Sequence, residues 1–174
     1  MRRVSISNIR VYNADAHFAS IISCIPGHEI EDIRLNDITI YYREMDSAFD
    51  AIPAMVPENE KQYPEPDKMG ILPAYGFFIR HARNLQFNKV TVAYLGKEVW
   101  PAFVIEAAKQ ISLYRVYAKP VAGVASFVLR AVKDFTLQDS APFLKQTGKD
   151  NKRGVVLKLG AFNSGKLSCY ITRG

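Results

Sequence analysis

Apolar and polar residues alternate along this chain in a pattern of about eight residues that recurs five times. In each copy the alternation is interrupted by a two-residue polar step and then starts again. Alternation with a period of two is typical of a β-strand that buries one face, and the polar step indicates a bend. Each copy therefore predicts two short strands joined by a bend. The copies span 4–11, 33–40, 85–92, 111–118 and 135–140, the last two being looser than the others.

The spacing of the copies predicts how they pack. Their first residues are 4, 33, 85, 111 and 135, which gives intervals of 29, 52, 26 and 24 residues. The interval of 52 indicates one repeat that carries a long insertion. Short strands repeating at this period bury their apolar face only by stacking on their neighbours, as in a solenoid. The sequence therefore predicts an all-β chain, a single domain over 1–174, built as a parallel β-helix of about five to six coils.

A second apolar segment precedes most copies and predicts a further strand in each coil. These segments begin at Ser20, Phe77, Ala102 and Ser126. The insertion covers about residues 43–76 and holds five of the nine prolines, so it is expected to be loop rather than sheet. Its apolar residues predict that it packs onto the stack: Ile52, Met55, Val56, Met69, Ile71 and Leu72.

The first copy begins only three residues after Met1 and has no preceding segment that would cover its apolar positions. An uncapped solenoid end exposes apolar side chains and unpaired backbone groups. The apolar positions that lack cover are Val4, Ile6, Ile9 and Val11, and two expectations follow. Either the chain is the C-terminal part of a longer protein, or it forms a homodimer through this N-terminal coil.

Composition and charge restrict the classes of partner and cofactor that this chain is expected to bind. No apolar run reaches the roughly 20 residues of a membrane span, so no membrane partner is expected. Residues 101–174 carry 12 basic and 4 acidic side chains, against 11 and 13 in residues 1–100. Because no aromatic residues interleave with the basic cluster at 145–153, nucleic acid is not the expected partner. Neither of the two cysteines, Cys24 and Cys169, has a second cysteine or a histidine at the spacing of metal ligands. The sequence therefore predicts neither a metal nor another cofactor.

Three stretches resemble the C-terminal coils of bacterial proteins in the polygalacturonase family (glycoside hydrolase family 28). The strand patterns of the first two are similar to that family but are weak on their own. The third is the most specific, because it joins Pro57-Glu58-Asn59-Glu60 with Tyr63-Pro64-Glu65-Pro66 and the segment from Leu72 to His81. The resemblance is good over about residues 3–110 and fades after that; the first two stretches are 3–28 and 31–43.

The resemblance implies a right-handed parallel β-helix that acts on pectic polysaccharide in the periplasm or outside the cell. Glycoside hydrolysis needs two carboxyl groups, one acting as acid and one as base or nucleophile. In this family they belong to an Asn-Thr-Asp motif and an Asp-Asp pair, which are followed by Gly-His-Gly and Arg-Ile-Lys. The chain contains none of these motifs, and Gly27-His28-Glu29 is interpreted as a turn. No catalytic residue is therefore assigned, and no localisation follows from the chain itself.

Four residues are candidates for contact with a sugar. Tyr63 and Tyr75 lie in the most specific stretch, and aromatic rings suit the apolar face of a pyranose. Arg80 and His81 follow a buried segment and are candidates for contact with an anionic sugar. The alternative for the tyrosines is a loop packed on the stack, and the alternative for Arg80 and His81 is a surface turn.

Two functions are consistent with these observations. The first is a C-terminal β-helix segment of a polygalacturonase-like glycoside hydrolase, inactive on its own because the catalytic motifs are absent. The second is a stand-alone carbohydrate-binding or self-associating β-helix module.

Overall fold

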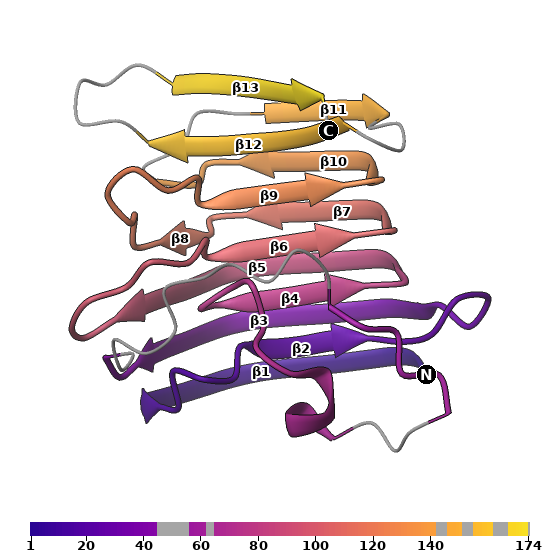
Figure 1. The fold of residues 1–174 in the computed structure, drawn as a ribbon, viewed down its shortest axis with the longest axis horizontal. Helices are drawn as coiled ribbons and strands as arrows, with labels where there is room; N and C mark the ends of the chain where they lie inside the picture. Colours follow the sequence, from indigo (N-terminus) through magenta and orange to yellow (C-terminus); the bar gives the residue numbers. More distant parts are fainter. Residues whose placement is uncertain (45–55, 62–64, 142–145, 151–154, 162–166, 174) are drawn as a thin grey trace.

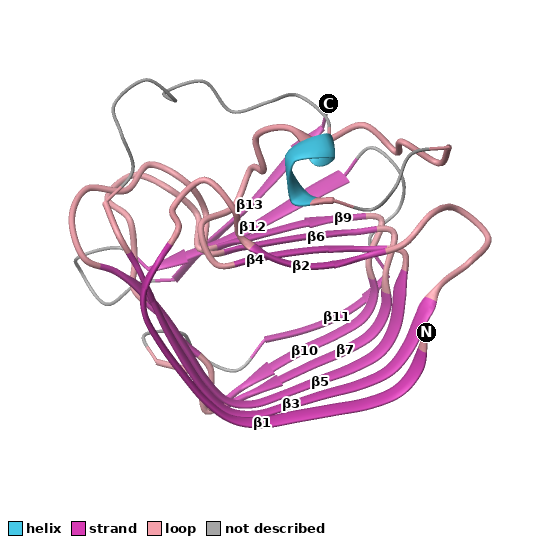
Figure 2. Ribbon diagram, turned by 90° about the horizontal axis from the view of Figure 1, so that it is seen from below, coloured by secondary structure: helices cyan, strands magenta, loops and turns pink. Residues whose placement is uncertain are grey.

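The computed structural model describes residues 1–44, 56–61, 65–141, 146–150, 155–161 and 167–173. Its strands form two sheets that face each other, and the chain passes repeatedly from one sheet to the other (Figures 1 and 2). The first sheet contains β1 (Arg2–Ala14), β3 (Ile30–Tyr42), β5 (Ala82–Tyr94), β7 (Lys109–Tyr114), β8 (Tyr117–Ala118), β10 (Lys133–Gln138) and β11 (Gln146–Asp150). The second contains β2 (Ser20–Ser23), β4 (Phe77–Arg80), β6 (Phe103–Glu106), β9 (Phe127–Arg130), β12 (Val155–Ala161) and β13 (Leu167–Arg173).

The register of the first sheet confirms the repeats that the sequence predicts. Val4 pairs with Ile33, and Ile33 pairs with Leu85 on its other side. Leu85 then pairs with Ile111, and Ile111 with Phe135, always in parallel. The first residues of all five copies therefore form one column across the sheet. The predicted second segments form strands β2, β4, β6 and β9, which also pair in parallel.

Each copy bends at two residues with a left-handed backbone. One lies immediately before the first apolar position and the other four residues after it, with φ between 48° and 59°. Asparagine and aspartate adopt this conformation more readily than other residues with a side chain. They occupy several of these positions. The residues are Arg3, Asp32, Asn84, Gln110 and Asp134, and then Asn8, Asp37, Lys89, Arg115 and Asp139. The first three copies are nevertheless continuous strands, β1, β3 and β5, where the sequence predicts two short strands, and only the fourth copy divides, into β7 and β8.

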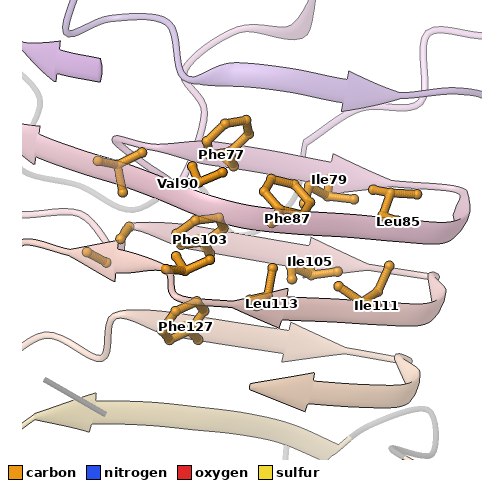
Figure 3. Close-up of a cluster of buried hydrophobic side chains, with 14 of the residues drawn as sticks. Phe77, Ile79, Leu85, Phe87, Val90, Phe103, Ile105, Ile111, Leu113 and Phe127 are labelled. Atoms are coloured by element: carbon orange, nitrogen blue, oxygen red, sulfur yellow. The ribbon is translucent and has the colours of Figure 1, made fainter. Parts of the chain in front are cut away.

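The core lies between the two sheets and is built from columns of like residues. Phe77, Phe103 and Phe127 lie above one another on β4, β6 and β9 (Figure 3). Their ring centroids are 5.3 Å and 4.9 Å apart, with interplanar angles of 13° and 18°. From the opposite sheet, Phe87 meets Phe77 edge to face at 5.2 Å. Stacking of this kind adds to the free energy gained by burying the rings.

The predicted insertion occupies the interval between β3 and β4. Its described residues contain no strand and one short 3-10 helix, η1 (Pro66–Met69). Val56 and Leu72 are buried against the outward-facing side chains of the second sheet, and Met69 packs at the edge of the same cluster. Ile71 is largely exposed, contrary to expectation, and Ile52 and Met55 lie outside the described residues.

The two ends of the stack are built differently (Figure 1). At the C-terminal end, β11 runs antiparallel to β10, β12 antiparallel to β9, and β13 antiparallel to β12. Within the described residues, the chain therefore does not finish this end with another parallel coil. At the other end, β1 and β2 are the edge strands of their sheets. We call this edge the open end.

Candidate functional site

Tyr75, a predicted sugar-contacting residue, lies inside the core. Its side chain has no exposed surface, and its ring meets Tyr42 and Tyr94 edge to face at centroid distances of 6.1 Å and 5.4 Å. Its hydroxyl donates to the carbonyl of Lys119 at 2.8 Å. A ring in this position has no face for a pyranose, so the alternative of a packed residue fits Tyr75. Tyr63 lies outside the described residues.

The buried tyrosines predict sensitivity to alkaline pH. Burial raises the pKa of Tyr42 from 10.0 to about 12, and burial also raises the pKa of Tyr75. The unfolded chain loses these protons near pH 10, whereas the folded chain retains them. The stability that comes from keeping Tyr42 neutral is therefore complete below pH 10 and is lost as the pH rises toward 12, by about 2–3 kcal/mol.

Circular dichroism and phenolate absorbance, followed together between pH 9 and 12.5, test this expectation. Part of the phenolate signal should appear only as the β-sheet signal is lost. Tyr42→Phe, which lacks the titrating group, should lose less stability across the same pH range. Full tyrosine ionisation near pH 10 with the sheet signal intact would contradict the prediction.

Arg80, the third predicted residue, anchors the insertion. Its side chain is only 4% exposed, and its two Nη atoms donate to the carbonyls of Val56 at 2.8 Å and Pro57 at 3.0 Å. The Nε lies 3.5 Å from a carboxylate oxygen of Glu58, which is an ion-pair contact without a hydrogen bond. The guanidinium also lies 5.4 Å from the centroid of the Phe78 ring. Val56, Pro57 and Glu58 belong to the insertion, so Arg80 holds this segment against β4.

His81, the fourth predicted residue, is in the turn after β4 and has φ of 50°. Its Nε2 lies 3.1 Å from both carboxylate oxygens of Glu58. The structure thus brings Arg80 and His81 together on one acidic residue of the insertion. Tyr75 is apart from this group, since it packs in the aromatic cluster with Tyr42 and Tyr94.

Several described carboxylates near the sheets form ion pairs with basic side chains. Arg83 lies 2.8 Å from Glu31, and Lys109 lies 3.1 Å from Glu29. In a glycoside hydrolase the general acid has a raised pKa. Burial raises the pKa of Glu98, but this residue is in the loop after β5 and is almost fully buried. One of its oxygens accepts from the backbone NH groups of Val99 and Trp100, so Glu98 orders this loop.

The open end contains a cavity of about 540 Å3, which is lined by Val4, Ile6 and Ile9 of the first copy and not by Tyr75, Arg80 or His81. It opens between the two sheets, where Ile6 and Ile9 are 38% and 37% exposed. Equivalent inward positions on the next strands are buried, as at Leu35 and Phe87. The predicted lack of cover over the first copy is therefore confirmed within the described residues. Pro66 and Met69 of the insertion form part of the same cavity wall.

The sequence analysis did not single out a pair of tyrosines on the first sheet, of which one is exposed and one is half-buried. Tyr12 is 72% exposed, and its ring centroid lies 4.9 Å from that of Tyr41 on the neighbouring strand. The signal was available, because each follows an inward-facing residue of the repeat, Val11 or Ile40. On the same two strands, Nη2 of Arg10 donates to both carboxylate oxygens of Asp37, at 2.9 Å and 3.0 Å.

Comparison of the chain with known protein families, with curated proteins and with solved structures finds no match to any of them. In the part of the chain that the structure describes, no helix has both the length and the apolar character needed to cross a membrane. Among the same residues, histidine, cysteine, aspartate and glutamate side chains form no group of three that could hold a metal ion. The candidate site is thus the open end, together with the exposed outer face of the first sheet.

Proposed function

We propose that this chain is a right-handed parallel β-helix that forms the C-terminal, non-catalytic segment of a polygalacturonase-like glycoside hydrolase. The observation that carries the proposal is the difference between the two ends of the stack. Antiparallel strands form one end. At the other end, each sheet stops at an edge strand, β1 or β2, and an apolar cavity lies between them. An edge of this kind is stable when a further β-layer covers it.

The outer face of the first sheet supports contact with a pectic polysaccharide. Across β5, β7 and β10, parallel pairing places Arg83, Lys109 and Lys133 in one exposed column. Lys89 and Arg115 are exposed at the bends of the same strands. Hydroxyl and amide side chains lie between these cations, namely Gln86, Ser112, Thr136, Asn88 and Gln138. Arg83 and Lys109 also pair with Glu31 and Glu29, but each keeps nearly half of its side chain exposed. A polar face with these cations can contact the carboxylates of an acidic sugar chain.

The purified chain is therefore expected to release no reducing ends from polygalacturonate, even after prolonged incubation. Hydrolysis needs a second carboxyl group placed across the sugar from the first, and the family's aspartate motifs are absent from the chain. A reducing-sugar assay at several pH values tests this, with an active polygalacturonase as the positive control. Cleavage by the purified chain would contradict the proposal.

The DNA upstream of the Met1 codon gives an independent test. The proposal expects in-frame codons for Asn-Thr-Asp, Asp-Asp and Gly-His-Gly. A stop codon directly upstream would favour the second candidate, a stand-alone carbohydrate-binding or self-associating module. The pair formed by the exposed Tyr12 and the half-buried Tyr41 supports that candidate, because an exposed aromatic ring can receive the apolar face of a sugar. Isothermal titration with pectic oligosaccharides would then show binding without cleavage.

A further inference from the structure

The first three strands of the first sheet alternate in charge from the open end inward. The first strand, β1, carries three arginines and no acidic residue, which gives +3. The next strand, β3, carries three acidic residues and one arginine, which gives −2. The third, β5, carries one arginine and one lysine and no acid, which gives +2. The anionic strand therefore lies between two cationic ones. On the far side of β5, β7 carries one lysine and no acidic residue, so the alternation belongs to the three strands nearest the open end.

Specific contacts accompany this alternation. Glu31 of β3 lies between Arg2 of β1, at 3.4 Å, and Arg83 of β5, at 2.8 Å. Arg10 of β1 contacts Asp37 of β3 through both carboxylate oxygens. Arg2 and Arg10 remain 68% and 56% exposed, so each side chain retains surface for a second acidic group.

The shape of the open end restricts its partner further. On the second sheet, outward-facing apolar residues form a column from β2 to β9, consisting of Ile21, Phe78, Val104 and Val128. Met69 of η1 packs on this cluster and, with Pro66, also lines the cavity at the open end. In Figure 1 the η1 segment extends past the level of β1 and β2. The η1 segment of the insertion thus lies beside the position that a further layer would occupy.

We propose that the open end binds an acidic β-layer, an inference that rests on the proposed function and names the chemistry of the missing layer. Its first strand pairs in parallel with the free edge of β1. It places acidic side chains against Arg2 and Arg10 and apolar side chains over Val4, Ile6 and Ile9. A second copy of this chain fits less well, since its own β1 brings three more arginines to the same edge.

A peptide copied from the chain is a suitable probe. The segment Glu29–Tyr42 contains β3, which already pairs in parallel with β1 in the required register. A strand of this sequence can therefore pair with the free edge of β1 in the same register, with its apolar side chains on the side of the core. We would measure binding of a fluorescently labelled peptide to the whole chain by anisotropy at low ionic strength. Saturable binding that weakens with added salt is the expected result.

Charge reversal tests the acidic requirement. A peptide with Glu31→Arg and Asp37→Arg should bind the native chain about tenfold more weakly, the sum of two exposed ion pairs. The chain variant Arg2→Glu/Arg10→Glu should prefer the reversed peptide by a similar factor. If that variant does not fold, as judged by circular dichroism, the two peptides on the native chain still decide the question.

Three outcomes would overturn the proposal. They are no binding of the native peptide, equal binding of the native and reversed peptides, and a homodimer in sedimentation equilibrium that excludes the peptide. The third would assign the open end to a second copy of the chain. None of them changes the result of the polygalacturonate assay or of the upstream sequence, so this inference and the proposed function can fail separately.

Discussion

Replacing Phe103 by alanine is expected to lower the free energy of unfolding by about 4 kcal/mol. Phe103 is fully buried and is the middle ring of the column that joins β4, β6 and β9 (Figure 3). Its ring stacks on Phe77 and Phe127 and also meets Phe87 at 6.1 Å. Removal of the ring leaves a cavity that three aromatic neighbours cannot fill without moving.

Urea unfolding followed by circular dichroism measures this loss. Phe103→Leu, which retains most of the apolar volume, should cost about 1–1.5 kcal/mol. The matched surface control is Phe18→Ala, because Phe18 is 39% exposed and its loss should cost less than about 1 kcal/mol. Similar losses for Phe103→Ala and Phe18→Ala would mean that the phenylalanine column does not stabilise the stack as described.

Replacing Arg80 by methionine is expected to cost about 3 kcal/mol and to release the end of the insertion from the second sheet. The buried guanidinium donates to the carbonyls of Val56 and Pro57, and methionine can donate to neither. The carboxylate of Glu58 also loses its contact with Arg80. Because the lost groups join the insertion to β4, local opening should increase more than global unfolding.

Limited trypsin digestion reports this local opening, since Lys61 and Lys68 are exposed residues of the insertion. Cleavage there should become about a hundredfold faster in Arg80→Met, while the sheet signal persists. Glu58→Gln is the control. It removes an ion pair to a carboxylate that is 40% exposed and should cost less than about 1 kcal/mol. Unchanged cleavage in Arg80→Met would show that other contacts hold the insertion.

Tyr75 and Arg80 show why the candidate site was harder to predict than the fold. Both were candidates for sugar contact because of their place in a short motif, with packing on the stack as the alternative for Tyr75 and a surface turn for Arg80. Tyr75 instead packs against Tyr42, which is 33 positions earlier, and Arg80 binds carbonyls about 23 positions earlier. A local sequence pattern reports which residue types occur together, but not which of them a distant segment will cover.

The sequence by itself determined the strand repeats, the column in which they pair and the polar positions where the backbone is left-handed, but not that β1, β3 and β5 each continue through their copy as one strand. Alternation decides which side chains face inward, and asparagine and aspartate favour the left-handed bends of residues such as Asn8 and Asp37. These are local properties, and each is repeated in several copies. Only the tertiary structure decided the reversal of β12 against β9, the burial of Tyr75 and the contact of Arg80 with the insertion. Each of these depends on contacts between segments far apart in the chain, for which the local pattern of apolar and polar residues carries no information.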